Sequence, residues 1–315
     1  MGDVPTNTMT AFDLTGKRED LSDEINILTK IDADFYNSCG TASVTALKHE
    51  FMTDIIRQPA ANKAKLGSDP TIATSQQPSK LFNYVQLQEE SFSIDDSSNA
   101  VKTAGNSGSY EYQKALKMKA LVGDMEYAFL REVRVEGSAS VAPSMRGLLN
   151  WQTTNLDKTD DATLEADGTI TGGTARELEK SLIKSVLQNM YSAGGGGQGK
   201  MLTTYCGSVQ KDKFDGFASI GNNRRAIAKD QVDDKVDLYV TSWGNVKAEI
   251  HRTMPTDVFV ILDLAYWKKA TLVPAGVEEL AKTSRSNSKY HMTVQHTLEA
   301  KNELSAGRIT NLSTT

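Results

Sequence analysis

The chain has 315 residues, of which 39% are hydrophobic and 24% are charged. These fractions are those of an ordinary folded protein, and the length suffices for one large domain or two smaller ones with a substantial core. The net charge of −5 and the pI near 5.5 argue against tight, sequence-independent DNA binding, which depends on neutralising phosphates with Lys and Arg.

The strongest apolar stretch, VFVILDLAYW, is interrupted by Asp263 and is shorter than the roughly 18 apolar residues of a membrane span. The first ten residues, MGDVPTNTMT, have neither the basic nor the apolar region of a secretion signal, so we expect the protein to act where it is made. Cys39 and Cys206 have neither the spacing of a metal site nor the density of a disulfide scaffold. We therefore expect two reduced thiols.

The first third of the chain is predicted to be an arm followed by a long hairpin. Residues 1–41 hold one short helix candidate, REDLSDEINIL, in otherwise polar sequence. β-Branched residues from Ala42 to Arg57, and strand-like sequence resuming at Leu81, predict two strands. The polar sequence between them would form a tip of about twenty residues, whereas hairpin loops usually have about two to five. We interpret residues 42–106 as a limb extending from the body, with a disordered insertion as the alternative.

The returning strand of this limb, NYVQLQEESFSI at residues 83–94, is apolar on both faces. Side chains alternate along a strand, so Phe82 and Tyr84 would point to one side, and Val85 and Leu87 to the other. A strand packed on its own core keeps its apolar residues on one face. Something must therefore cover the second face.

Two helices are predicted in the middle of the chain. Apolar residues three or four apart in SGSYEYQKALKMKALVGDMEYAFLREV predict an amphipathic helix over residues 107–134. About 25 helical residues at ~1.5 Å each would give a length near 38 Å. A second helix is indicated at TARE, where Thr174 and Glu177 fit a capping box, and would end at Gly194.

Strands are predicted after the second helix at KMLTTYC, KVDLYVTSWG, NVKAEIHR, DVFVILDL and KYHMTVQHTLEA. The sequence contains no internal repeat and no heptad array. With few parallel β-α-β units, the predicted fold class is α+β.

The run GGGGQGKM matches most of a phosphate-binding loop through Gly194, Gly199 and Lys200. The pattern then requires Ser or Thr to hold magnesium, and this chain has Met201. Its context is also reversed, because a phosphate loop leads from a strand into a helix N-terminus, and here a helix ends and a strand begins. We predict a helix-to-strand turn and no nucleotide site.

Other candidate chemistry is weak. NNRRAIAKD is the best basic patch; we interpret Arg224 and Arg225 as an exposed or intersubunit salt-bridging loop, with nucleic-acid contact as the alternative. No catalytic residue, cofactor or metal ligand is predicted. The histidines lack the spacing of a zinc helix, being scattered at His49, His251, His291 and His296.

An ordered set of segments resembles the major capsid proteins of tailed bacteriophages, which have the Hong Kong-type capsid fold. The resemblance runs from about Phe12 to Leu312, and its specificity comes from nine segments in the right order. They are TGKREDLSDEI, KHEFMTDII, NYVQLQEESFSI, YQKALKMKALVGDMEYAFL, RGLLNWQTTN, VDLYVTSWG, VFVILDLAYWKKATL, EELAKT and HTLEAKNELSAGRITNL.

The resemblance implies an N-terminal arm, an extended β-hairpin loop, a peripheral domain built on a long spine helix, and an axial domain that meets its copies at fivefold and sixfold axes. The strand at residues 83–94 would then be covered by its hairpin partner, by the next subunit and in part by solvent. The implied boundaries are 1–41 for the arm, 42–106 for the loop, 107–148 with 251–315 for the peripheral domain, 107–134 for the spine helix within it, and 149–250 for the axial domain.

The implied function is structural. Copies would assemble through pentamers and hexamers, by head-to-tail contacts that close into rings, into an icosahedral or elongated shell enclosing double-stranded DNA. The implied partners are a separate scaffolding protein, a portal protein, a possible decoration protein and packaged DNA in non-specific contact, without a membrane. The protein would be assembled in the host bacterial cytoplasm and reside in the virion capsid.

Two other classes remain as alternatives: another phage structural component, such as a tail or baseplate protein, and an α+β enzyme or ligand-binding protein. An enzyme would need a pocket with convergent polar groups. On the capsid interpretation, the predicted intersubunit contacts are Phe51, Asp54, Ile55, Phe82, Tyr84, Val85, Leu87, Phe92, Arg224 and Arg225.

Overall fold

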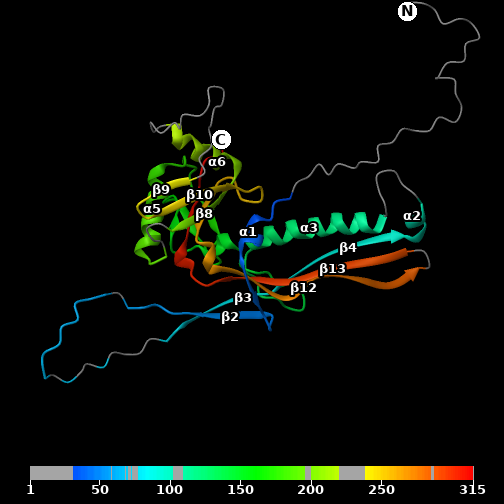
Figure 1. Cartoon of the computed structure of the whole chain (residues 1–315), viewed down its shortest axis with the longest axis horizontal. Helices are drawn as coiled ribbons and strands as arrows, with labels where there is room; N and C mark the ends of the chain where they lie inside the picture. The colour runs from blue at the N-terminus through cyan, green and yellow to red at the C-terminus, as the bar shows by residue number, and fades with distance from the viewer. Residues whose placement is uncertain are drawn as a thin grey trace, which may run out of the picture.

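The computed structural model describes residues 31–57, 59–67, 69, 72, 77–101, 109–195, 200–219, 238–284 and 287–314. The molecule is elongated: a long helix lies along a sheet at one end, a second sheet forms the broader end, and a β-hairpin projects from the body (Figure 1). This mixed architecture confirms the α+β class. Among the described residues, no helix is both long and apolar enough to cross a membrane.

A four-stranded sheet and the long helix α3 (Ser109–Arg131) form the narrow end. Leu121 and Met125 on α3 pack against Phe92 and Met292 of the sheet, in a core that includes neighbouring apolar residues. The helix therefore packs through one apolar face, as its sequence period predicts. The strand order is β1–β12–β13–β4, with bounds Gly40–Ser43, Trp267–Ser284, Asn287–Ala300 and Gln86–Asp95.

The long strand β12 was not among the strands predicted from the sequence. Its pairing with β13 is irregular, with register shifts between Thr271 and Val273 and between Val273 and Gly276. Such irregularities break the two-residue alternation by which a strand is recognised from sequence. β1 pairs in parallel with the beginning of β12, and the short helix α2 (Asp96–Ala100) follows β4.

A six-stranded sheet forms the broader end. Its central strand β11 is buried on both faces: Phe259 and Ile261 belong to one core, and Val260 and Leu262 to another. This explains the continuous apolar run in its sequence, because a strand covered on both faces does not alternate. The order is β5–β14–β11–β8–β10–β9, with bounds Leu156–Asp157, Ala306–Ile309, Phe259–Leu262, Met201–Cys206, Gly244–Ile250 and Leu238–Thr241.

Helices α5 (Lys180–Ser192) and α6 (Ser208–Ser219) contribute to the core on one side of this sheet. The capping box predicted for α5 is wrong: the helix begins after Glu179, and the Thr174 hydroxyl instead donates to the Asp161 carboxylate at 2.5 Å. The predicted end is confirmed, since Gly194 follows the helix with a φ of +87°.

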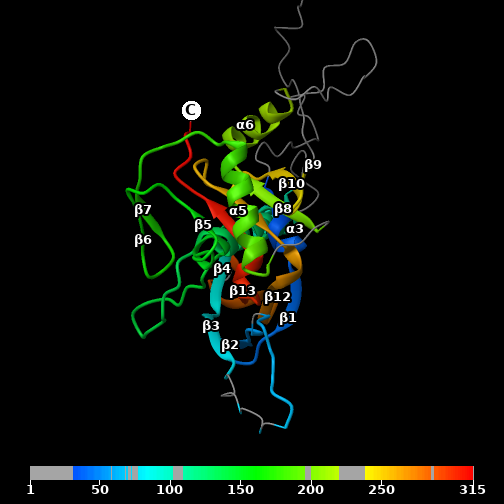
Figure 2. The ribbon, with the colours of Figure 1, turned by 90° about the vertical axis from the view of Figure 1, so that its left-hand side faces the viewer.

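Short elements connect the two ends. The hairpin of β6 (Ala162–Leu164) and β7 (Ile170–Gly172) lies at the side of the body (Figure 2). Gly168 in its turn has a φ of +92°, a left-handed conformation that favours glycine. The others are α4 (Leu148–Trp151) and two 3-10 helices, Leu264–Tyr266 and Glu303–Ser305.

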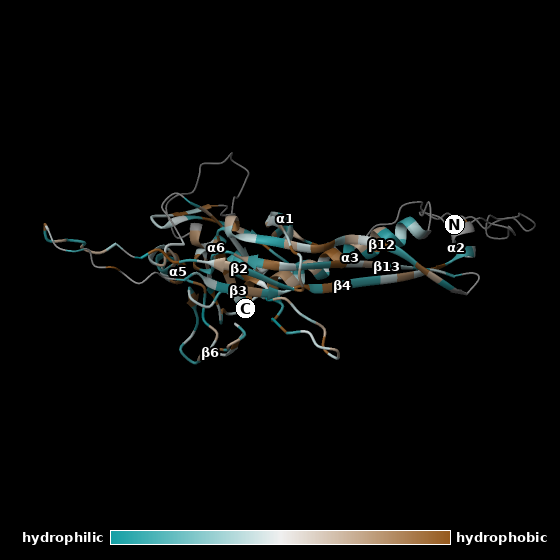
Figure 3. Cartoon of the chain, turned by 90° about the horizontal axis from the view of Figure 1, so that it is seen from below, coloured by the Kyte–Doolittle hydropathy of each residue, from teal (hydrophilic) through white to brown (hydrophobic). Residues whose placement is uncertain are grey.

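The projecting hairpin consists of β2 (Lys48–Thr53) and β3 (Ser79–Tyr84), which, among the strands that the structure describes, pair with each other alone (Figure 3). The prediction of a single strand over residues 83–94 is wrong. Val85 lies between two strands, because the chain leaves β3 there and enters β4 in the four-stranded sheet. Phe92 and Ile94 then lie on the inner face of β4. The change of phase reflects passage from one sheet to another, and β4 itself keeps one phase.

The largest core cluster lies where the two sheets and α3 meet. It contains Phe129 from α3, Tyr205 from β8, Trp267 from β12, and Phe35 from the short helix α1 (Asp34–Ser38). All four side chains are fully buried. The two ends of the molecule are therefore joined by a continuous apolar core.

Candidate assembly surfaces

The projecting hairpin exposes apolar side chains. Ile55 and Ile56, directly after β2, are 65% and 90% exposed, and Leu66 and Ile72 farther along the tip are also exposed. Isolated exposed apolar residues are ordinary, but several on one projecting segment are typical of a surface that another protein covers. The tip is therefore a candidate assembly surface.

The root of the hairpin is fixed to the body by a buried amide. Asn83 is fully buried, and its Nδ2 donates to the Leu298 carbonyl at 2.8 Å. Its Oδ1 accepts from the Arg146 N–H at 2.7 Å and from the Tyr84 N–H at 3.0 Å. A buried polar group is costly unless hydrogen-bonded, so these bonds hold β3 at one place on the body.

Aromatic contacts reinforce the root. The Phe51 ring lies 6.0 Å from that of Trp151. On Phe82, the Lys48 ammonium and the Arg134 guanidinium lie 4.2 Å and 4.3 Å from the ring centre, within cation–π range. The hairpin thus combines a root with many contacts and a tip with exposed apolar residues.

The ten residues predicted to contact other copies differ in exposure. Phe51, Val85 and Phe92 are buried by the chain's own residues, which leaves little side-chain area for a second copy. The role of all ten as intersubunit contacts stays a prediction. The remaining seven are half-buried at Phe82 and Tyr84, exposed at Asp54, Ile55 and Leu87, and outside the described residues at Arg224 and Arg225.

A second candidate surface lies at the β9 edge of the six-stranded sheet. Val240 is 67% exposed, and a cavity of ≈ 520 Å³ beside it is lined by Lys184 of α5 and by residues 239–243. An edge strand presents backbone groups that can pair with another chain. No residue of this surface was among the predicted intersubunit contacts, unlike several residues of the hairpin. A strand lies at a sheet edge because of the strand order, which the sequence pattern does not give.

The glycine-rich segment lies between a helix and a strand in the chain order. α5 ends before it and β8 begins after it, as predicted, while Gly196–Gly199 lie outside the described residues. Lys200 Nζ donates to Asp263 Oδ2 at 2.9 Å, and this hydrogen bond raises the pKa of Lys200. The lysine that a phosphate loop would use is thus paired with a carboxylate.

The cysteines and histidines have structural surroundings. Cys39 and Cys206 are free, buried thiols, and burial raises the pKa of Cys206 to about 12, so its thiol is protonated at neutral pH. Among the described residues, no group of three or more His, Cys, Asp or Glu side chains could hold a metal ion. His251 is paired with Glu126 in the core, and His296 is buried.

The model of the SU10 major capsid protein family matches residues 4–313. The chain belongs to this family. It is a shell-forming capsid protein of a bacteriophage and a component of the virion, and the tail, baseplate and enzyme alternatives are not favoured. No curated protein matches the sequence.

Solved structures confirm the Hong Kong-type fold. A chain of the cyanophage A-1(L) capsid aligns with a TM-score of 0.70 and 12% identity, covering 97% of this chain and 99% of that one. The capsid of cyanophage P-SCSP1u gives 0.64 and 10%, with 99% and 97% covered. Mycobacterium phage Che8 gives 0.60 and 12%, with 94% and 98% covered. At such low identity, the likeness shows the fold alone.

Proposed function

We propose that copies of the chain assemble through pentamers and hexamers into a closed shell around double-stranded DNA, and that the hairpin lies across the neighbouring copy. The observation that supports this most directly is the hairpin with its exposed Ile55 and Ile56. A tip that meets a different surface on the next copy makes a head-to-tail contact, which closes into rings when the rotation permits.

The domain boundaries follow the same proposal. Residues 1–41 would form the arm, 42–106 the extended loop, 149–250 the axial domain, and 107–148 with 251–315 the peripheral domain. The β2–β3 hairpin lies inside the proposed loop, whereas β1 and β4 at its two ends pair with body strands. The part that projects is accordingly shorter than the proposed loop.

The other partners belong to the proposal as well. A separate scaffolding protein, a portal protein and a possible decoration protein would assemble with the shell in the host cytoplasm, and DNA would contact its inner surface non-specifically. The acidic net charge of −5 suits this, because weak phosphate neutralisation leaves packaged DNA free to leave. We expect no catalytic activity.

The hairpin tip supplies the test. In the double variant Ile55→Asp and Ile56→Asp, two charges replace exposed apolar side chains, so the folded subunit should keep its thermal midpoint while shell assembly is lost. The matched control is Ile55→Val with Ile56→Val, which should assemble normally. Assembly with the scaffolding protein would be followed by electron microscopy. Normal shells from the aspartate variant would refute the proposed contact.

A further inference from the structure

The short helix α1 lies between the two sheets. Phe35 is fully buried, and its ring makes edge contacts with Tyr205 of the six-stranded sheet at 5.9 Å and with Trp267 of the four-stranded sheet at 6.4 Å. The next residue, Tyr36, packs edge-on against Phe129 of α3 at 5.0 Å. Two consecutive residues therefore contact both sheets and the long helix.

A buried carboxylate on α3 binds the backbone of α1. Glu126 is fully buried; its Oε1 accepts from the Phe35 N–H at 2.9 Å and its Oε2 from the Tyr36 N–H at 2.8 Å. These bonds join residues about ninety positions apart in the chain. Burying a carboxylate costs free energy unless charged or hydrogen-bonding partners surround it. The two N–H groups of α1 offset part of this cost for Glu126.

The third partner of this carboxylate comes from the six-stranded sheet. His251 directly follows β10, and its Nε2 lies 2.7 Å from Glu126 Oε1, with both side chains fully buried. His251 Nδ1 accepts from the Thr253 N–H at 3.2 Å, so the other ring nitrogen, Nε2, is the one that lies beside Glu126. Glu126 is thus the point at which α3, α1 and the six-stranded sheet meet.

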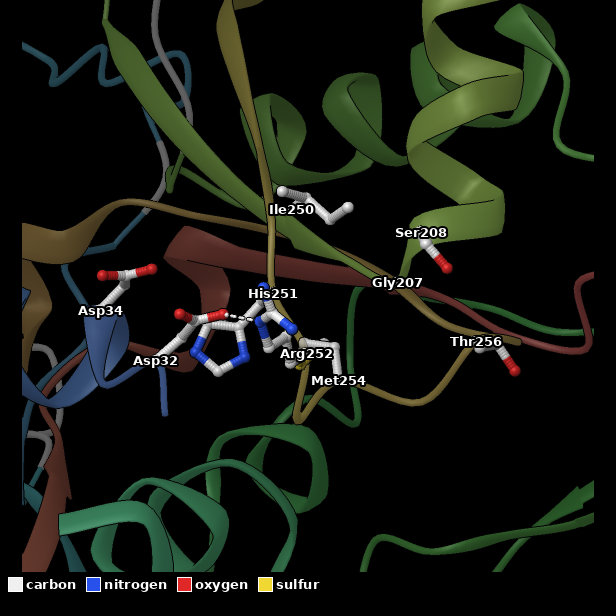
Figure 4. Close-up of a pocket in the computed structure, with 9 residues that line it drawn as sticks. All are labelled: Asp32, Asp34, Gly207, Ser208, Ile250, His251, Arg252, Met254 and Thr256. Carbon is white, nitrogen blue, oxygen red and sulfur yellow. Dashed lines mark hydrogen bonds and ion pairs between the residues drawn. The ribbon is translucent and has the colours of Figure 1, made fainter. Parts of the chain in front are cut away.

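The beginning of α1 is held by an exposed ion pair, which is weaker than the buried hydrogen bonds of Glu126, and a cavity lies beside this ion pair. Arg252 Nε donates to Asp32 Oδ2 at 2.9 Å, and the two side chains face each other in Figure 4. They line a cavity of ≈ 580 Å³ together with Asp34 and His251. The cavity therefore borders the beginning of α1.

We propose that α1, Glu126 and His251 form a joint that fixes the position of the six-stranded sheet relative to α3, and that Glu126 is its positioning residue. Residues 1–30 precede this joint in the sequence, so a partner bound to them would be connected through the chain to α1. The joint is a property of the single chain. Its consequence for the shell, that unseating α1 permits a rigid-body change between the two sheets, rests on the proposed function.

The test replaces one acceptor of the joint and measures local opening. In Glu126→Gln, an amide NH₂ replaces one carboxylate oxygen, so one of the two α1 N–H groups loses its acceptor. Hydrogen exchange of the purified full chain, read on the segment 31–40, should accelerate about 10-fold to 100-fold, as expected for losing a hydrogen bond to a charged group. Exchange in segment 259–262, which is strand β11, should be unchanged. The matched control on the same helix is Glu111→Gln, which is exposed.

Unchanged exchange at 31–40, or equal acceleration throughout the chain, would overturn the joint. If Glu126→Gln does not fold, Asp32→Ala removes the carboxylate that Arg252 contacts and should accelerate the same segment a few-fold. In assembled particles, Glu126→Gln should lower the temperature at which precursor shells change form, as seen by electron microscopy. If wild-type subunits form no shells, the proposed function fails, while the exchange result still decides the joint.

Discussion

His296 should make the subunit acid-sensitive. Its ring is fully buried in β13, packed edge-on against Phe129 at 4.8 Å and tilted against Tyr36 at 5.8 Å. Burial lowers its pKa from 6.5 to about 4, and the positive charge of Lys269 acts in the same direction. The folded protein therefore holds this ring neutral at pH values where the unfolded chain protonates it.

The direction of the effect follows from proton binding. Between pH 6.5 and about 4, the unfolded chain binds the proton and the folded protein does not, so acid favours unfolding. Above pH 6.5, His296 does not change the free energy of unfolding. Below pH 6.5, it lowers the free energy of unfolding by about 1.4 kcal/mol for each pH unit, and the total loss is about 3 kcal/mol near pH 4. At pH 5 the expected loss is about 2 kcal/mol.

Substituting His296 by Leu removes this titration and keeps an apolar side chain among Phe129 and Tyr36. Urea unfolding, followed by tryptophan fluorescence, would be compared at pH 7.5 and pH 5. With a urea dependence of about 3 kcal/mol per M, the wild-type midpoint should fall by roughly 0.7 M more than that of His296→Leu. The control is Met292→Leu on the same strand, a volume-conserving change at a buried residue that leaves His296 in place and should keep the wild-type pH dependence. Parallel pH dependence in wild type and His296→Leu would refute the reasoning.

Two further predictions concern glycine conformation and the glycine-rich turn. Gly168→Ala should cost about 3 kcal/mol or more in thermal or urea unfolding, because its φ is +92° and a Cβ would lie 2.0 Å from the Asn150 carbonyl oxygen. Gly216→Ala, in α6 with nothing within 4 Å of the new Cβ, should instead stabilise by about 0.5 to 1 kcal/mol, and equal effects at the two sites would contradict this account. Lys200→Ala should lower stability by less than about 1 kcal/mol and leave shell assembly and any ATP hydrolysis unchanged; an ATPase activity that depends on Lys200 would reopen the nucleotide interpretation.

The spacing of apolar residues predicted those helices and strands that keep one pattern from end to end. α3 and α5 were predicted because their apolar residues recur every three or four positions, and β8, β11 and β13 were predicted from β-rich runs. The family resemblance added what local period cannot supply, the order of these elements in a known architecture. It also decided the function, because no residue cluster in the sequence specifies a shell.

The predictions were wrong where residues that match a local pattern instead contact residues far away in the sequence. Thr174 and Glu177 in TARE match a capping box, but Arg176 forms an isolated β-bridge with Leu312 near the other end of the chain, and the helix begins later. At Val85, the chain moves from the hairpin to the four-stranded sheet, and β4, taken by itself, keeps its alternation. A pattern read along the chain cannot show to which sheet each half belongs.

The buried polar residues explain why the assembly surface could be located only in part. Asn83 and Leu298, separated by 215 residues, hold the hairpin root by one hydrogen bond, and nothing near Asn83 in the sequence distinguishes it from an exposed amide. A fixed root has a consequence for assembly. A limb that is already oriented loses less conformational freedom when a neighbour covers its tip, so more of the apolar contact at Ile55 and Ile56 appears as binding free energy. Asn83 would therefore contribute to assembly without contacting the neighbour, through the orientation it gives to the exposed tip.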